Sequence, residues 1–360
     1  GRGASVWDAS GTEYIDCTSQ AWSLNLGYGH PRVLEAAARQ MEKLTHVRTS
    51  FDTEVHLALS QRLARLAPGD FPKEVGFCLH GSLAVETAMK QALRQNERGS
   101  FVALYDAYHG RSFGGMALSW PHPDNAFLGY QGRVVRVPQA YCYRCYFGLE
   151  YPGCGLQCLK FTETALDKAV DGQPIAFVME PVQGNGGMID FPPEYYTGIR
   201  EICTRRGILL IWDEIQTAFG RVGAMTAGEL YGVAPDILLF GKAIGGGFPL
   251  AGTVARDDLQ PLQPGDSGFT FGTFPVSMAA ALATLDVLEE EDLLARCRAL
   301  GAQITARLKE LQERYELIGD VRGPGLMIGF ELVEDRETRA PARAQADRFI
   351  EEGLRRGVIF

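Results

Sequence analysis

Short apolar runs and amphipathic segments alternate through the middle of the chain. Residues 82–95 and 192–207 place their apolar side chains at helical spacing. Five apolar runs instead have the length of buried β-strands, and they lie at 74–80, 101–108, 174–181, 207–214 and 236–242. Strand and helix patterns that alternate in this way are typical of a parallel sheet with crossover helices. The hydrophobic pattern therefore predicts an α/β fold.

The two ends of the chain have patterns of a different kind, which predict a smaller α+β unit. They comprise a hairpin at 5–19, helical stretches at 30–44, 274–315 and 343–357, and a strand at 325–332. We expect a large domain over 49–286, with a cysteine-rich insert at 141–158. The N-terminal segment 1–48 is expected to join a C-terminal small domain over 287–360. The chain begins at Gly1 without a methionine and stops within a strand-like pattern at its other end, so we expect the natural protein to extend beyond both ends.

Composition and charge narrow the class of protein. The chain has 360 residues, of which 46% are hydrophobic and 22% charged, as in ordinary globular proteins. A formal net charge of -9 disfavours a broad basic surface for nucleic acid. No apolar run approaches the roughly 18 residues that cross a membrane, and no signal-peptide pattern is present. We therefore expect a cytoplasmic protein without a nucleic-acid or membrane partner.

Chemically distinctive residues follow each of the five strand patterns. They are Gly81 and Ser82, Tyr108 and His109, Glu180, Asp213, and Lys242. Ligands of open α/β sheets bind outside the carboxyl ends of the strands, where these residues would meet. Taken alone, each residue has an ordinary structural explanation as a helix cap, a core side chain or a solvated strand end. Their coincidence at five strand ends favours one binding site.

These residue types suit an aromatic phosphate that carries an aldehyde. Backbone N–H groups of Gly81 and Ser82 at a helix start would bind the phosphate. Tyr108 would stack on a flat ring, and Asp213 would keep a ring nitrogen protonated. Lys242 would form a Schiff base, and the glycine run behind it would let the lysine swing.

Three longer motifs carry a family resemblance. "EPVQGNGG" at 180–187, "LLIWDEIQTAFGRVG" at 209–223 and "PDILLFGKAIGGGFPLAG" at 235–252 resemble, in order and spacing, the class III aminotransferases. These enzymes use pyridoxal 5'-phosphate (PLP) and have fold type I, and the likeness extends over nearly the whole chain. The resemblance implies a large domain with a mostly parallel seven-stranded sheet sandwiched by helices. It also implies a smaller α+β domain built from both chain ends.

The resemblance assigns roles around the cofactor. Lys242 is similar to the Schiff-base lysine that also shuttles the proton, and Asp213 to the carboxylate that faces the pyridinium nitrogen. Gln216 is similar to the residue that contacts the phenolic oxygen. Gly81 and Ser82 match the phosphate-binding pair. Tyr108 matches the ring-stacking aromatic, in a motif that also places His109 at the cofactor.

The resemblance also implies a partner subunit and a substrate side of the site. Thr270 matches a threonine that reaches the phosphate of the neighbouring subunit's cofactor, which implies a homodimer with shared active sites. Arg111 occupies a position that holds a substrate carboxylate in some members. Glu180 is similar to a glutamate that pairs with a C-terminal arginine in some members.

The cysteine-rich insert suggests a metal. Cys142, Cys145, Cys154 and Cys158 have the spacing C-x2-C-x8-C-x3-C, and such paired thiols can bind structural zinc or an iron–sulfur cluster. Two alternatives remain open. The thiols can be small buried hydrophobes, or they can form disulfides in an oxidising compartment.

The sequence thus predicts an aminotransferase with a ping-pong cycle. A terminal or omega amine of an amino acid or diamine is the expected amino donor, and a keto acid or aldehyde the acceptor. A racemase, aminomutase or decarboxylase on the same scaffold is the first alternative. A phosphate-ligand binding protein without catalysis is the second.

Overall fold

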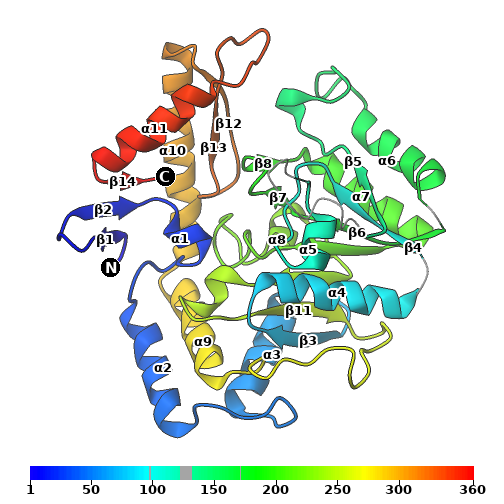
Figure 1. Ribbon diagram of the computed structural model, residues 1–360, viewed down its shortest axis with the longest axis vertical. Coiled ribbons are helices and arrows are strands. Elements are labelled where there is room, and N and C mark those ends of the chain that lie inside the picture. Colours follow the sequence, from blue (N-terminus) through cyan, green and yellow to red (C-terminus); the bar gives the residue numbers. More distant parts are fainter. Residues whose placement is uncertain (97–98, 122–131, 171) are drawn as a thin grey trace.

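The computed structural model describes residues 1–96, 99–121, 132–170 and 172–360 and has a seven-stranded sheet at its centre (Figure 1). The strand order is β3-β11-β10-β9-β6-β4-β5. Their bounds are β3 (Lys73–Cys78), β4 (Gly99–Leu104), β5 (Val134–Val137), β6 (Gln173–Met179), β9 (Leu209–Asp213), β10 (Ile237–Phe240) and β11 (Ala251–Arg256). Only β11 runs antiparallel to its neighbours. The predicted α/β fold with a mostly parallel sheet is confirmed.

Alternate side chains of the central strands enter two different cores. In β6, Phe177 packs into a cluster with residues of α7 (Pro193–Arg206), whereas the next residue, Val178, packs into a cluster with residues of α4 (Gly81–Gln95). Successive side chains of a strand point to opposite faces, so a sheet with helices on both faces needs apolar residues at every position. This requirement explains the continuous apolar runs of the sequence.

The helices follow local signals in the chain. Helix α7 ends at Gly207, whose φ of 64° is the left-handed conformation of a glycine C-cap. The long helical pattern at 274–315 forms two helices, α9 (Pro275–Glu290) and α10 (Leu293–Arg314). Asp292 between them is left-handed, with a φ of 47°. Because Asp292 lies within a run of good helix formers, the sequence pattern does not indicate that the helix is interrupted there.

The two chain ends meet in a small sheet. Strands β1 (Ser5–Trp7) and β2 (Glu13–Asp16) form the expected hairpin, and β14 (Val358–Ile359) pairs in parallel with β2. Strands β12 (Ile318–Arg322) and β13 (Gly329–Leu332) and helices α10 and α11 (Arg343–Arg355) lie beside it (Figure 1). The exact domain boundaries stay a prediction.

Shorter and peripheral elements complete the described chain. They are α1 (Ser19–Trp22), α2 (Pro31–Lys43), α3 (Glu54–Leu66), α5 (Phe113–Leu118), α6 (Gln157–Lys168), α8 (Ala227–Tyr231), β7 (Val182–Gln183), β8 (Ile189–Asp190) and the 3-10 turns η1 (Cys142–Arg144) and η2 (Lys242–Gly245). Within the described ranges, no helix has the length and apolar character needed to cross a bilayer.

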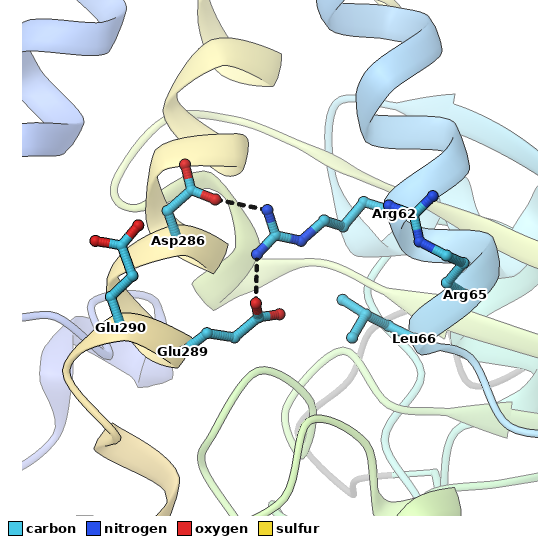
Figure 2. A pocket seen from close by; sticks show the side chains of 6 residues that line it. All are labelled: Arg62, Arg65, Leu66, Asp286, Glu289 and Glu290. Carbon is cyan, nitrogen blue, oxygen red and sulfur yellow. Dashed lines mark hydrogen bonds and ion pairs between the residues drawn. The ribbon is translucent and has the colours of Figure 1, made fainter.

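An ion-pair cluster joins α3 to α9 at the surface (Figure 2). Arg62 of α3 donates to Asp286 over 2.5 Å and to Glu289 over 2.9 Å, both on α9. The hollow beside these side chains is lined by charged residues and Leu66, and none of the strand-end residues belongs to it. The cluster therefore holds two helices together and is separate from the site described next.

Candidate active site

A cavity of about 190 Å³ lies at the carboxyl ends of the parallel strands. It is bounded by the ends of β4, β6, β9 and β10 and by the start of α4. Its lining residues are His80, Gly81, Ser82, Tyr108, His109, Gly110, Glu180, Asp213, Ile215, Gln216 and Lys242. The structure therefore brings together eight of the residues that the sequence placed at one site.

Asp213 and His109 form a buried pair at the base of the cavity. His109 Nδ1 lies 2.8 Å from Asp213 Oδ2, and both side chains are almost fully buried. Burial alone would lower the pKa of His109, but the hydrogen bond and charge of Asp213, with the charge of Glu180, raise it above its ordinary value. Asp213 Oδ1 also accepts a hydrogen bond from the Ile215 N–H over 3.2 Å.

Glu180 is a buried carboxyl group on the same side of the cavity. Its Oε1 accepts from the Tyr108 N–H over 2.8 Å, and its Oε2 accepts from the Gly184 N–H over 3.1 Å. Burial raises the pKa of Glu180 to about 7, while the nearby His109 opposes this rise and Asp213 adds to it. Glu180 therefore fixes the backbone of Tyr108 and changes charge near neutral pH.

Lys242 points into the cavity from the turn that follows β10. Its backbone is left-handed, with a φ of 48°, in a turn that continues into the glycine run. The Lys242 ammonium donates to Gln216 Oε1 over 3.1 Å. Burial lowers the pKa of Lys242, although Asp213 and Glu180 act in the opposite direction. A larger share of this amine is therefore neutral, and nucleophilic, than for an ordinary lysine.

The start of α4 can receive an anion. Gly81 is the first helical residue, and within the described chain no side chain caps this end. The backbone N–H groups of a helix start, together with the helix dipole, favour a phosphate. Ser82 Oγ accepts from the Arg111 N–H over 3.2 Å, and Gly110 packs closely against Ser82. A Cβ on Gly110 would lie 2.2 Å from Ser82 Oγ, so this approach requires glycine.

Two predicted residues lie outside the cavity. Thr270 and Arg111 are both exposed, and neither belongs to the lining set. Arg111 lies next to Gly110 at the rim. Thr270 follows β11 in the chain, and its predicted role concerns a second copy of the protein.

The sequence reasoning missed Trp22 and Glu214. The ring centre of Trp22 lies 5.4 Å from the Lys242 ammonium. Trp22 ends a turn of four left-handed residues, Ser19–Trp22, and Asp16 accepts from the Gln20 N–H within it over 3.0 Å. No local signal in the sequence joins Trp22 to a lysine 220 positions away. The clue for Glu214 was its place directly after Asp213.

Glu214 is fully buried beneath the site. It accepts from the N–H groups of Ala227 and Gly228 over 2.6 and 2.9 Å, and from the Thr217 hydroxyl over 3.0 Å. Burial raises the pKa of Glu214 to about 7 despite these donors. Glu214 thus fixes the start of α8 to the segment that carries Asp213.

The metal predicted at the cysteine-rich insert is not supported. Within residues 1–96, 99–121, 132–170 and 172–360, no group of three or more His, Cys, Asp or Glu side chains is arranged to hold a metal ion. Cys142, Cys145, Cys154 and Cys158 are free thiols, so the disulfide alternative is also not observed. They line one small cavity together with aromatic side chains such as Tyr151. Because zinc requires four ligands converging on one point, thiols that merely share a cavity do not form its site.

The cavity residues fit a PLP molecule. The open start of α4 suits its phosphate, Asp213 its ring nitrogen, and the Lys242 amine its aldehyde. Gln216 Nε2 and His109 Nε2 are buried polar atoms that have no hydrogen-bond partner among the described residues. Buried polar groups are normally satisfied, so such atoms are consistent with a polar ligand or water in the cavity.

Fold and site together define a PLP-dependent enzyme of fold type I. The family model "Aminotransferase class-III" matches residues 1–360, and the chain belongs to this family. It is 36% identical over 362 residues to a leucine/methionine racemase of Thermococcus litoralis, covering 99% of this chain and 82% of the relative.

Two further proteins that resemble this chain are named as transaminases. A 5-aminovalerate aminotransferase of Pseudomonas aeruginosa is 36% identical over 375 residues, which cover 99% of this chain and 83% of the relative. A solved amine transaminase from an uncultivated Pseudomonas species superposes with a TM-score of 0.90 at 33% identity, covering 100% of this chain and 86% of that one. The expected family, fold and PLP dependence are therefore confirmed.

Proposed function

We propose that the protein transfers an amino group from a terminal or omega amine of an amino acid or diamine to a keto acid or aldehyde. Two half-reactions share one site in a ping-pong cycle. The observation that carries this proposal is the Lys242 amine, with its lowered pKa, in one cavity with the His109–Asp213 pair and the open start of α4. A relative named for 5-aminovalerate supports a donor whose amine is remote from its carboxylate.

Bound PLP supplies an aldehyde that condenses with amines and a ring that withdraws electrons. Lys242 would hold the cofactor aldehyde through its amine, and the same amine would carry the substrate proton. Asp213, held by its contact with His109, would face the ring nitrogen and keep its proton in place. Gln216 Nε2 would donate to the phenolic oxygen, and Gly81 and Ser82 would bind the phosphate.

The substrate side is assigned to Arg111 and Glu180, which lie near the ring-stacking Tyr108 in the chain or in the fold. Tyr108 stacks on the ring, with its backbone fixed by Glu180. Arg111 at the rim provides a cation for a carboxylate. Glu180 is near its titration point at neutral pH, because burial raises its pKa to about 7, and it can therefore adjust its charge to the substrate.

The assembly and the compartment are part of the same proposal. The active form is a homodimer in which Thr270 of each chain reaches the phosphate site of the other. The exposed position of Thr270, outside the cavity of its own chain, is consistent with this role. All eight cysteines are free thiols, which supports a reducing compartment such as the cytoplasm.

A racemase is the second candidate, because a leucine/methionine racemase is among the relatives. One experiment separates the two. The PLP-loaded protein is incubated with a single amino donor and no acceptor, first an omega-amino acid and then a chiral α-amino acid, and the carbonyl product and both enantiomers are measured. A transaminase releases one carbonyl product per site, an aldehyde from a terminal amine or a keto acid from an α-amine, and stops until an acceptor is added. Continued turnover to the opposite enantiomer would establish the racemase instead. Lys242→Ala is the control that abolishes either reaction.

A further inference from the structure

The cysteine-rich insert touches the small domain at one end and the active-site wall at the other. In Figure 1 the insert lies between α6 and the strands β12 and β13. Two of its aromatic residues and one arginine contact the small domain, and Tyr146 contacts the loop after β4. The two sets of contacts lie in one short segment, residues 141–146, which contains the 3-10 turn η1.

The small-domain end is a half-buried ionic cluster around Glu331 of β13. The Glu331 carboxylate accepts from the Tyr141 hydroxyl and from Arg144 Nε of the insert. Arg322 of β12 donates to Glu331 over 3.1 Å and lies 5.0 Å above the ring of Tyr141. Arg339 donates to the Tyr143 carbonyl. Removing the carboxylate would leave the half-buried Arg144 and Arg322 without the acceptor that they share.

The other end of the insert fixes Asp106, two residues before Tyr108. The Tyr146 hydroxyl donates to Asp106 Oδ2 over 2.9 Å, and Gln139 Nε2 donates to the same oxygen over 2.8 Å. Asp106 is left-handed, with a φ of 55°. This conformation is strained for a residue with a side chain, so the two donors help to hold it. The rings of Tyr105 and Tyr146 also pack, with centroids 5.3 Å apart.

We propose that Tyr146 and Glu331 are positioning residues at the two ends of a strap, residues 141–146, that couples the small domain to the wall carrying Tyr108. The strap holds Asp106 in its left-handed conformation and thereby sets the direction in which the chain enters Tyr108. Its effect on catalysis rests on the proposed function, whereas the coupling itself is a property of the chain and can be measured without cofactor.

The test is a double-mutant cycle in the apoprotein, read by amide hydrogen exchange over 105–110 and over 318–332. Tyr146→Phe removes the active-site contact, and Glu331→Gln removes the small-domain contact. Each single variant should raise exchange at 105–110 by roughly tenfold, the loss expected for one hydrogen bond to a charged group. The double variant should raise it no further. If the two sites were uncoupled, the free-energy changes that the two substitutions cause at 105–110 would instead add in the double variant.

Tyr151→Phe is the matched control. It removes a tyrosine hydroxyl from the same insert, but the Tyr151 hydroxyl donates to Glu194 over 3.0 Å, and Glu194 belongs to neither end of the strap. It should leave exchange at 105–110 unchanged. The proposal fails if Glu331→Gln alters only 318–332, or if the two effects multiply. Should Glu331→Gln not fold, Tyr141→Phe removes one donor to Glu331 and is read in the same way.

A second readout connects the strap to the cofactor. The visible circular dichroism of bound PLP reports how the ring is held, so Tyr146→Phe and Glu331→Gln should change it alike, while Tyr151→Phe should not. Unchanged dichroism in both strap variants would overturn the positioning role. A natural protein that takes up no PLP would refute the proposed function, and the exchange measurement would still decide whether the strap exists.

Discussion

The charge of Lys242 depends on a balance between burial and its two acidic neighbours. Burial favours the neutral amine, and Asp213 and Glu180 favour the ammonium; the net effect is a lowered pKa. A neutral amine is the form that attacks an aldehyde. The cavity therefore prepares Lys242 for covalent chemistry without any other residue acting as its base.

Chemical labelling of the apoprotein should show this lowered pKa. Natural protein and Lys242→Arg are treated with trinitrobenzenesulfonate over a range of pH, and the difference in modified amines isolates Lys242. We expect its reactivity to reach half-maximum below pH 10.5, the ordinary lysine value. A half-maximum at or above that value would contradict the account of burial.

His109 should contribute to stability through Asp213. Replacing it with phenylalanine leaves the buried Asp213 side chain without the partner of its 2.8 Å hydrogen bond, which costs about 3 kcal/mol of unfolding free energy. His109→Asn retains a donor near the position of Nδ1, 2.8 Å from Asp213, and should lose about half as much. Urea unfolding of the two apoproteins measures both values. Equal losses would show that the hydrogen bond to Asp213 is unimportant.

The strand-end residues could be predicted from the sequence, but their surroundings could not. Asp213 and Lys242 each follow a buried apolar run, and parallel strands bring such ends to one edge. Trp22 lies near Lys242 only because the fold brings two distant parts of the chain together, and no periodic pattern in the sequence indicates such a contact. The metal site predicted at the cysteine-rich insert is not supported, for a related reason. The spacing of thiols along the chain does not determine whether their side chains converge on one point in the fold.

At the level of elements, buried strands with continuous apolar runs were predictable and irregular ones were not. Strand β11 was not predicted, because it contains Gly252 and Thr253 where a buried strand usually has large apolar residues. A Cβ on Gly252 would lie 2.0 Å from the Gly76 carbonyl oxygen of β3, so close strand approach requires glycine there. Helices α9 and α10 were predicted as one stretch because the left-handed Asp292 has no distinctive sequence signal.

The start of α4 should lose anion affinity when Gly110 gains a side chain. Gly110 has a φ of 106°, and a Cβ in Gly110→Ala would meet Ser82 Oγ at 2.2 Å and so displace it. We expect the dissociation constant of the apoprotein for PLP to rise roughly tenfold, the loss of about one hydrogen bond to a charged group. Fluorescence titration measures it.

Gly207→Ala is the control for that experiment. Gly207 has a similar left-handed backbone, with a φ of 64°, but a Cβ there would meet no atom within 4 Å. This variant should cost about 1 kcal/mol of stability from backbone strain and leave PLP affinity unchanged. If both alanine variants weaken PLP equally, general destabilisation is the cause and not the displaced Ser82.

On the scale of the whole molecule, the buried Glu214 should make stability depend on pH. Its pKa is raised from 4.5 to about 7, so between these values the folded protein retains a proton that the unfolded chain has lost. The contribution of protonated Glu214 to the free energy of unfolding is complete below pH 4.5 and is lost as the pH rises toward 7. The total loss is about 3 kcal/mol.

Glu214→Gln isolates this contribution because glutamine stays neutral. Its unfolding free energy relative to natural protein should increase by about 3 kcal/mol between pH 4.5 and pH 7.5. Urea unfolding at several pH values measures the difference, in which titrations common to both proteins cancel. A difference that does not change with pH would mean that Glu214 is ionised throughout.

Shared active sites can be tested by mixing two inactive chains. If Thr270 serves the cofactor of the other subunit, Lys242→Ala and Thr270→Ala chains complement each other in a mixed dimer. One of its sites then carries both substitutions, and the other carries neither. Random exchange of equal amounts makes half of the dimers mixed, so activity should return to about a quarter of the natural value. Each variant alone provides the baseline. Activity no greater than the average of the two baselines would show that Thr270 does not complete the partner's site.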